Sequence, residues 1–465
     1  MVDRLGALLH VTDPDEGLET APLQFDSKPV LKGKLGLKDA YSTIICNIIG
    51  SGIFSTPGLV YAAAGSACAS VLVWVFSGFL SILGALCYVE LATGHVNSAA
   101  EAAYFEKAFN KSISFSFLVV SFLALSSGSI AIEATVFAKY FMAIFNINSG
   151  IAHGIVAVGL IVVLAHVNRK GVQQSAEIQQ AMVVFKVAAV FMIIIALFFT
   201  PQSLMDGANF SSLSECFAGT SPGKFGLGTL GALWAYSGYN SVCALSEEFN
   251  NPKKDLPLGT FFGMFTVITL YIFCNYAYLR VIDPLVLATS DSIGYTFAMK
   301  VGGEAFAIAL SLAIMLATMG AAHATIFGQA RLFYAAGRDG IFSEWFGKVN
   351  KAGVPANSTM ALCAWSCVLV LLGNNLSILI NYSGVATWLF AGLAGLAVIR
   401  LRGSTIGESF RMQCFPASPL TFASACFAIV LSGFVTDFYP TSIVFILVIT
   451  TIIYYVSTHG LRGSS

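Results

Sequence analysis

One apolar segment near the N-terminus contains the run Ile48-Ile49-Gly50-Ser51-Gly52-Ile53-Phe54-Ser55-Thr56-Pro57-Gly58. Its last nine residues include three glycines, three hydroxyl side chains and a proline, which are difficult to keep helical. Backbone groups freed by a break in a hydrophobic span are tolerated only against protein or a water-filled cavity. The run therefore predicts a broken helix, although glycines in spanning helices also serve close packing.

The composition of the whole chain places this run in a membrane. Of 465 residues, 57% are apolar and 10% are charged, against roughly 45–50% and about 25% in soluble globular chains. So few charges cannot cover a water-facing surface, and we expect membrane lipid to cover most of it. The formal net charge is zero, which argues against a nucleic-acid partner.

The sequence predicts an all-α polytopic membrane protein with twelve transmembrane helices, because twelve apolar segments are long enough to cross about 30 Å of hydrocarbon. Residues 1–39 precede them as a polar tail. The third and eighth segments are the longest, which predicts tilted helices. The segments lie at residues 40–63, 70–94, 113–145, 151–167, 177–200, 226–249, 257–280, 302–334, 356–374, 376–400, 419–438 and 441–458.

Lysine and arginine are distributed unevenly between the predicted loops. Nineteen basic residues fall on the side that holds both termini, and four fall on the opposite side. This bias predicts cytoplasmic termini and an even number of spans, and we expect the protein in the plasma membrane. The longest outer loop, 201–225, carries the sequon Asn209-Phe210-Ser211, which is either a glycosylation site or a chance match.

A second breakable segment lies in the sixth predicted span, at Leu233-Trp234-Ala235-Tyr236-Ser237-Gly238-Tyr239-Asn240-Ser241. Breaks in the first and sixth spans, five helices apart, are typical of an inverted pair of five-helix repeats. Half-helix N-termini suit a carboxylate, and half-helix C-termini with free carbonyl groups suit an ammonium. An α-amino acid carries both groups, so the paired breaks predict an amino acid site.

These segments resemble the amino acid–polyamine–organocation superfamily, and within it the L-type amino acid transporter group. Besides the two breakable runs, residues 84–91 at the end of the second span and 330–340 after the eighth carry the resemblance. The matching segments occur in order between about residues 36 and 400.

The resemblance implies the ten-plus-two-helix fold of that family. In this chain the first five-helix repeat would cover residues 40–200, and the inverted second repeat would cover 226–400. Two additional helices would follow at 419–458.

The resemblance also implies a role for the backbone at both breaks. The N–H groups of Ser51 and Gly52, with the Ser51 hydroxyl, would hold the substrate carboxylate, and Gly50 beside them is a further substrate-binding residue. Carbonyl oxygens on both sides would receive the ammonium, at Ile48, Trp234, Ala235 and Ser237.

Side chains around the breaks are implied to shape the rest of the site. Trp234 would close over the substrate as an outer lid, and Asn240 would line the pocket. Thr325 lies in the eighth span, where the family builds its side-chain pocket. The neighbouring His323 is either a second pocket residue or a hydrogen-bonded packing residue.

Two charges inside predicted spans call for an explanation, since a lone charge at mid-membrane costs about 2.5–3.5 kcal/mol on insertion scales. Lys186 lies mid-way along the fifth span. An ammonium there can replace the cation of sodium-coupled relatives or exchange a proton, unless it snorkels to the surface. Glu133 lies in the third span, where it either faces the pathway or sits near the outer interface.

The chain departs from the family pattern at three places, and two of these departures carry an expectation. The light chains of heteromeric transporters have a cysteine after the third span, and residues 145–151 have none, so we expect no disulfide-linked heavy chain. The connection 404–419 lacks the family's proline-and-basic run. Ser237 stands where many members have glycine, which narrows the pocket.

The sequence thus predicts a secondary transporter of L-amino acids, with neutral ones expected, working by sodium-independent alternating access through exchange or proton linkage. The alternatives are a cationic amino acid or polyamine carrier and a non-transporting amino acid sensor on the same fold. Motifs of hydrolases, nucleotide-binding loops and metal sites are missing from the sequence. We therefore expect no enzyme activity, no cofactor and no metal.

Overall fold

The computed structural model describes residues 35–95, 101–170, 172–205, 207–208, 217, 219–338, 340–373, 376–403, 409–436 and 438–459. Most of the predicted tail and the sequon at Asn209 lie outside these residues. Within them the regular structure is helical, apart from one isolated bridge between Leu35 and Phe249. The predicted all-α class is therefore confirmed for the described part of the chain.

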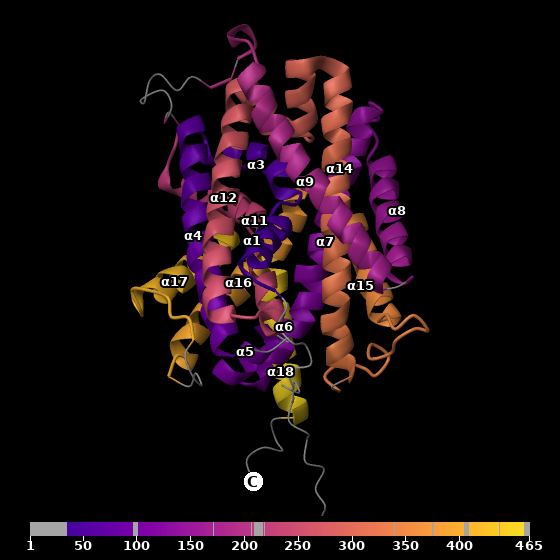
Figure 1. The fold of residues 1–465 in the computed structure, drawn as a ribbon, viewed down its shortest axis with the longest axis vertical. Helices are drawn as coiled ribbons and strands as arrows, with labels where there is room; N and C mark the ends of the chain where they lie inside the picture. The colour runs from indigo at the N-terminus through magenta and orange to yellow at the C-terminus, as the bar shows by residue number, and fades with distance from the viewer. Residues whose placement is uncertain are drawn as a thin grey trace, which may run out of the picture.

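Nine helices in the described residues are long and apolar enough to cross a membrane, and a bent first pair would make a tenth. Figure 1 shows the long helices running side by side along the molecule. They are α4 (Ala67–Gly94), the continuous α6 (Lys111–Val120), η1 (Ser121–Ser126) and α7 (Ser127–Ile144), α8 (Gly150–Asn168), α9 (Val172–Phe199), α12 (Pro252–Val281), α14 (Ile293–Arg338), α16 (Leu376–Leu401), α17 (Ala417–Thr436) and α18 (Phe438–His459).

The first predicted span is divided into three helices, α1 (Leu37–Ile48), α2 (Gly52–Ser55) and α3 (Pro57–Ala64). The chain bends by 60° between α2 and α3. Pro57 at the first position of α3 favours a new helix start there, because its ring fixes φ and its missing N–H needs no partner. The predicted break is therefore present in the structure.

Two other predicted spans form helices shorter than a full crossing. The sixth consists of α11 (Pro222–Ala235) followed by the 3-10 helix η3 (Tyr239–Glu248), and the ninth is α15 (Ala356–Leu372), with 17 residues. A straight helix needs about 20 apolar residues to cross the hydrocarbon. The count of twelve spans therefore stays a prediction.

The structure adds short helices that hydropathy does not indicate. They are α5 (Glu101–Ala108), η2 (Gln202–Leu204) and α13 (Pro284–Thr289). A further short segment opens α14, which is interrupted at Gly303 with φ of 70°. All of them are too short to cross a bilayer. Hydropathy patterns that identify spanning helices therefore do not reveal them.

Helix α1 packs closely on α12. A side-chain carbon added at Gly259 would lie 2.4 Å from Ala40 Cβ, and one at Gly263 would lie 2.7 Å from Ile44. Small residues let helices in a membrane approach until backbone atoms touch. The glycines of α12 therefore fix the broken first span against the seventh.

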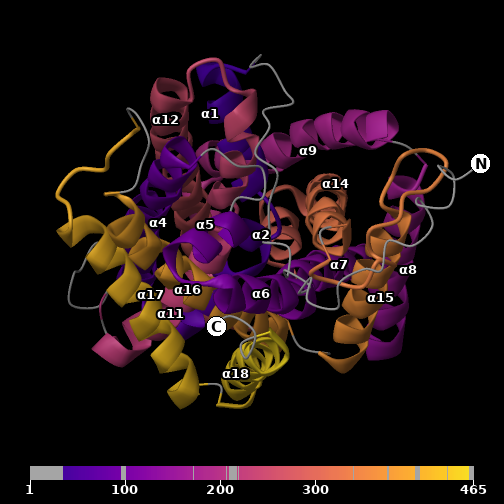
Figure 2. The same ribbon diagram turned by 90° about the horizontal axis from the view of Figure 1, so that it is seen from below.

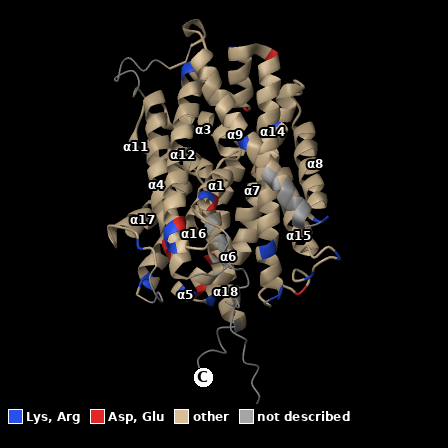
Figure 3. Cartoon of the chain, viewed as in Figure 1, with Lys and Arg blue, Asp and Glu red and all other residues tan. Residues whose placement is uncertain are grey.

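Seen from below, α2 and α6 lie near the middle of the bundle, with α8 and α15 at one edge and α17 at the opposite edge (Figure 2). Large apolar side chains are exposed on the outer helices, including Ile151, Phe199 and Val435. Figure 3 shows most of the charged residues in the lower part of the bundle and few along the remaining length of the long helices. An apolar outer surface of this kind suits a lipid environment.

Candidate functional site

Both predicted breaks are open stretches of backbone between helices. In the first, α1 ends at Ile48 and Ile49 takes an extended conformation before α2 begins at Gly52. In the second, α11 ends at Ala235 and η3 begins after Gly238, whose φ is 109°. Because this φ lies in the left-handed region, it favours glycine.

The two breaks contact each other through their glycines. A side-chain carbon at Gly52 would lie 2.4 Å from Ala235 Cα, and one at Gly238 would lie 2.7 Å from the carbonyl oxygen of Asn47. The Asn47 side chain also donates a hydrogen bond to Ser241 Oγ at 2.7 Å. The glycines are therefore required for the backbone of one break to rest directly on the other.

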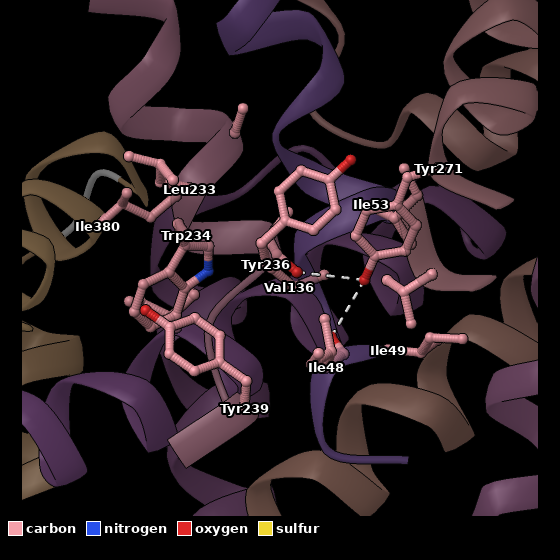
Figure 4. Packing of buried hydrophobic residues seen from close by; sticks show 14 of the residues in the cluster. Ile48, Ile49, Ile53, Val136, Leu233, Trp234, Tyr236, Tyr239, Tyr271 and Ile380 are labelled. Carbon is pink, nitrogen blue, oxygen red and sulfur yellow. Dashed lines mark hydrogen bonds between the residues drawn. The ribbon is translucent and has the colours of Figure 1, made fainter. Parts of the chain in front are cut away.

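Tyr271 of α12 joins the carbonyl groups of both breaks (Figure 4). Its hydroxyl donates to the Ile48 carbonyl oxygen at 3.1 Å and to that of Ala235 at 3.2 Å. A hydroxyl group has one proton, so it satisfies these two acceptors only in part. Both carbonyls were predicted to receive an ammonium, and both keep acceptor capacity.

The Trp234 carbonyl has local partners. Its oxygen accepts hydrogen bonds from the Ser237 backbone N–H at 3.1 Å and from Ser237 Oγ at 2.7 Å. The Trp234 side chain is buried and lies beside Tyr239 in Figure 4. Ser237 therefore stabilises the turn that ends α11, a contact that glycine would not make through a side chain.

Glu133 of α7 occupies the amide side of the first break. Its Oε1 accepts a hydrogen bond from the Ser51 N–H at 3.4 Å. Glu133 is 6% exposed and Ser51 is fully buried. Glu133 Oε2 and Ser51 Oγ are both buried. Lys139, in the same helix, pairs instead with Asp291, so Glu133 faces the break and does not lie at the outer interface.

Lys186 links the fifth predicted span to the first. Its Nζ donates a hydrogen bond to the Cys46 carbonyl oxygen at 2.9 Å, in the last turn of α1. The Lys186 side chain is 5% exposed, so it does not snorkel to a surface. The ammonium therefore binds a carbonyl beside the break.

The predicted side-chain pocket residues lie in different surroundings. Asn240 donates to both carboxylate oxygens of Glu101 at 3.2 Å. Thr325 is partly exposed, one helical turn beyond Ala321, which lies 3.7 Å from a side-chain carbon placed at Gly50. His323 is fully buried, and both of its ring nitrogens lack a partner among the described contacts.

Glu101 begins α5, outside the membrane-spanning helices, and binds two elements at once. Besides Asn240 it accepts a hydrogen bond from the Tyr88 hydroxyl at 2.8 Å. Burial raises the pKa of the Glu101 carboxyl, while the hydrogen bonds from Tyr88 and Asn240 act in the opposite direction. Through Glu101, α5 is tied to the end of α4 and to the start of η3.

Sequence reasoning missed three groups that position the site: Tyr271, Glu101 and Tyr140. The Tyr140 hydroxyl donates to the Phe54 carbonyl oxygen at 2.7 Å and accepts from the Gly294 N–H at 3.0 Å. For the two tyrosines, a hydroxyl inside an apolar spanning segment was the available signal, because a buried hydroxyl usually finds a hydrogen-bond partner.

The chain is similar to known proteins over most of its length. The profile of the family described as amino acid permease matches residues 35–457. This match covers both breaks and all the described helices except the last two residues of α18.

Similar proteins include three amino acid transporters. The chain is 29% identical to the b(0,+)-type amino acid transporter 1 of Mus musculus over 393 residues, which cover 83% of this chain and 80% of that protein. It is 29% identical to the cystine/glutamate transporter of Homo sapiens over 446 residues, 94% of this chain and 87% of that one. It is 30% identical to the large neutral amino acids transporter small subunit 2 of Homo sapiens over 405 residues, which cover 84% of this chain and 74% of that protein.

Proposed function

This chain belongs to the amino acid permease family, a family of multi-pass membrane proteins, and we propose that it is a secondary transporter of neutral L-amino acids. One observation carries the proposal. Backbone amide and carbonyl groups of two helix breaks meet where Gly52 touches Ala235, so the two halves of a zwitterion could be bound within one site.

The proposed site assigns each half of the zwitterion to one kind of backbone group. The carboxylate binds the N–H groups of Ser51 and Gly52, with the Ser51 hydroxyl as a further donor and Gly50 beside them. It shares the Ser51 N–H with Glu133 Oε1.

The ammonium binds carbonyl oxygens, and the shared proton of Tyr271 leaves capacity for it. Tyr271 contacts two of these acceptors, the carbonyls of Ile48 and Ala235. The others are the carbonyl of Ser237 and that of Trp234, which would have to exchange a hydrogen bond from Ser237 for the ammonium.

Side chains complete the proposed site. Trp234 acts as the outer lid, and Thr325 faces the substrate side chain. Asn240 acts at the edge of the site, because its amide holds Glu101 at the start of α5.

We further propose the family's architecture for the whole chain. It comprises twelve spans, with a first five-helix repeat over 40–200, an inverted repeat over 226–400 and two further helices over 419–458. Both termini would face the cytoplasm, with the protein in the plasma membrane. The missing cysteine in 145–151 supports function without a disulfide-linked heavy chain.

The proposed mechanism is sodium-independent alternating access. The Lys186 ammonium donates a hydrogen bond to the Cys46 carbonyl oxygen beside the first break. This position supports a role in which Lys186 replaces a coupling cation or exchanges a proton. The mode of transport is either exchange or proton linkage. The bundle of the first, second, sixth and seventh spans would rock against the remaining helices around the site.

Uptake of radiolabelled amino acids into proteoliposomes tests the proposal. We expect saturable uptake of neutral L-amino acids that is unchanged when sodium is replaced by potassium. A panel of the twenty amino acids at two pH values separates exchange from proton linkage. Binding without uptake would contradict the transporter and favour a sensor, whereas uptake of arginine in preference to leucine would favour a cationic carrier.

A further inference from the structure

We propose that Tyr140 of α7 is a positioning residue for transport, whose hydroxyl group holds the outer path to the helix breaks closed. The outer end of the bundle is the end that contains α3 and α13, and α3 lies away from the C-terminus in Figure 1. This inference rests on the proposed function in one respect, the movement of the first span against the third and the eighth during alternating access.

The Tyr140 hydroxyl joins three elements of the bundle. It donates a hydrogen bond to the Phe54 carbonyl oxygen of α2 at 2.7 Å and accepts one from the Gly294 N–H of α14 at 3.0 Å. Tyr140 is fully buried. A tyrosine hydroxyl has one proton to donate and can also accept, so both of its functions are used. One buried group therefore connects the first span with the third and the eighth.

The two hydrogen bonds of Tyr140 join different pairs of elements. Gly294 is the second residue of α14, and the N–H groups in the first turn of a helix have no acceptor within that helix. Tyr140 supplies this acceptor, and α7 and α14 both belong to the helices against which the first span moves in the proposed mechanism. The bond to Phe54 crosses from these helices to the first span. It is therefore the bond that has to break when the first span moves.

Helix α7 contacts the first span at two points on one of its faces. Glu133 lies seven residues before Tyr140, about two helical turns, so the two side chains share a face. Glu133 Oε1 accepts from the Ser51 N–H at 3.4 Å, at the break itself. Tyr140 bonds to the Phe54 carbonyl in the helical turn that follows. Tyr140 therefore holds α2 beyond the proposed carboxylate site and does not need to contact the substrate.

The first span is closed against α13 at the outer end. A side-chain carbon placed at Gly58 of α3 would lie 2.3 Å from the Leu287 carbonyl oxygen, so the two backbones are in contact. Leu287 is 1% exposed. Phe54 precedes this contact by four residues, so the Tyr140 hydroxyl fixes the backbone that leads into it. Loss of one buried hydrogen bond changes an equilibrium constant about fivefold, and we expect the hydroxyl to favour the closed arrangement by this factor.

The neighbouring ion pair does not replace this bond. Lys139, beside Tyr140, pairs with Asp291, whose side chain is 80% exposed. Exposed ion pairs contribute little to stability. Asp291 lies two residues before α14, so the pair joins α7 to the start of α14 and does not reach the first span. Among these contacts, the hydrogen bond from Tyr140 to Phe54 is the one that responds to movement of the first span.

Labelling of a reporter cysteine in the purified full-length protein tests the proposal. Leu287→Cys places a thiol at the contact with α3, and its rate of modification by a maleimide is measured alone, with Tyr140→Phe and with the control Tyr278→Phe. Tyr278 of α12 is also fully buried, and its hydroxyl has no hydrogen-bond partner among the described residues. Protein without Leu287→Cys gives the background from the native cysteines. We expect labelling about fivefold faster with Tyr140→Phe and unchanged with Tyr278→Phe.

Gly294→Ala provides a second variant, in which the tyrosine is kept. Its Cβ would lie 3.0 Å from the Tyr140 hydroxyl oxygen, so the hydroxyl has to shift, and labelling should again be faster. Thermal unfolding first establishes that each variant is folded. An unchanged labelling rate with either Tyr140→Phe or Gly294→Ala, or an equal increase with Tyr278→Phe, would overturn the proposal.

Uptake of leucine into proteoliposomes separates this inference from the proposed function. Faster labelling with Tyr140→Phe, without leucine uptake by the wild type, would support the role of Tyr140 and contradict the transporter. Leucine uptake by the wild type, with equal labelling rates with and without Tyr140→Phe, would overturn the role of Tyr140 and leave the transporter intact.

Discussion

Gly52 and Ala235 are in backbone contact although 182 residues separate them in the chain, and a Cβ atom at Gly52 would lie 2.4 Å from Ala235 Cα. This contact brings the start of α2 against the end of α11. It explains why the Gly50-Ser51-Gly52 run cannot be understood as a local helix break alone. The first predicted span needs a glycine at this point because the sixth rests on it.

The Tyr271 hydroxyl is expected to hold the two breaks together. Removing it in Tyr271→Phe leaves the Ile48 and Ala235 carbonyls with one donor fewer, which should lower the free energy of unfolding by about 1 kcal/mol. Added substrate should restore part of this loss, because its ammonium donates to the same carbonyls. Thermal unfolding with and without leucine measures both effects. A ligand-induced shift smaller in the variant than in the wild type would contradict the assignment of these carbonyls.

Gly238 is expected to tolerate no side chain. Gly238→Ala would force a positive φ of 109° on alanine and place Cβ 2.7 Å from the Asn47 carbonyl oxygen. The φ alone costs about 1–2 kcal/mol, and the contact should add to it. Gly353→Ala is the matched control, because Gly353 has φ of 71° and no atom within 4 Å of the added carbon. Equal loss of thermal stability in the two variants would show that the contact with Asn47 is unimportant.

Lys186 is expected to act on turnover more than on affinity. Lys186→Ala removes the hydrogen bond to Cys46 and the positive charge beside the break. The kcat for uptake should fall, and the pH dependence of uptake should change, while KM changes less. Lys348→Ala, at an exposed lysine, serves as the control. An unchanged rate and pH profile would remove Lys186 from the mechanism.

Glu101 is expected to make stability depend on pH. The pKa of the Glu101 carboxyl is raised in the folded protein, so folding favours its protonated form. The contribution of Glu101 to stability is therefore fully present below the pKa that this carboxyl has in the unfolded chain. It is lost as the pH rises through the pKa that the carboxyl has in the folded protein. Thermal stability should therefore fall over this acidic window in the wild type and less so in Glu101→Gln. Parallel pH profiles for the two proteins would show that the carboxyl is not the titrating group.

The helix breaks and the transporter family were predictable because both rest on local chemistry. Glycine, hydroxyl residues and proline in an apolar span indicate a break wherever they occur, and the resemblance needed only ordered motifs. The apolar length of most spans was equally visible. Where helices are short, as for α15 and α11, hydropathy placed the segment but not its length.

The contacts between distant segments were not predictable, because they join residues far apart in the chain. Glu90 illustrates this: it forms an ion pair with Arg402 at 3.0 Å and accepts from the Met412 N–H at 2.8 Å. The sequence around each of these residues gives no indication of which distant residues it contacts. In the same way, the direction in which Glu133 faces depends on how α7 packs, and the sequence left two alternatives for it.

Gly52→Ala tests the central claim, that an amino acid binds where the two helix breaks meet. The measurement is radiolabelled leucine uptake into proteoliposomes by the wild type, by Gly52→Ala and by Gly159→Ala, a control glycine with no atom within 4 Å of an added Cβ. All three proteins are first checked for equal incorporation and monodispersity. We predict that the wild type and Gly159→Ala take up leucine while Gly52→Ala loses at least about tenfold in kcat/KM. Normal uptake by Gly52→Ala would contradict this account of the site.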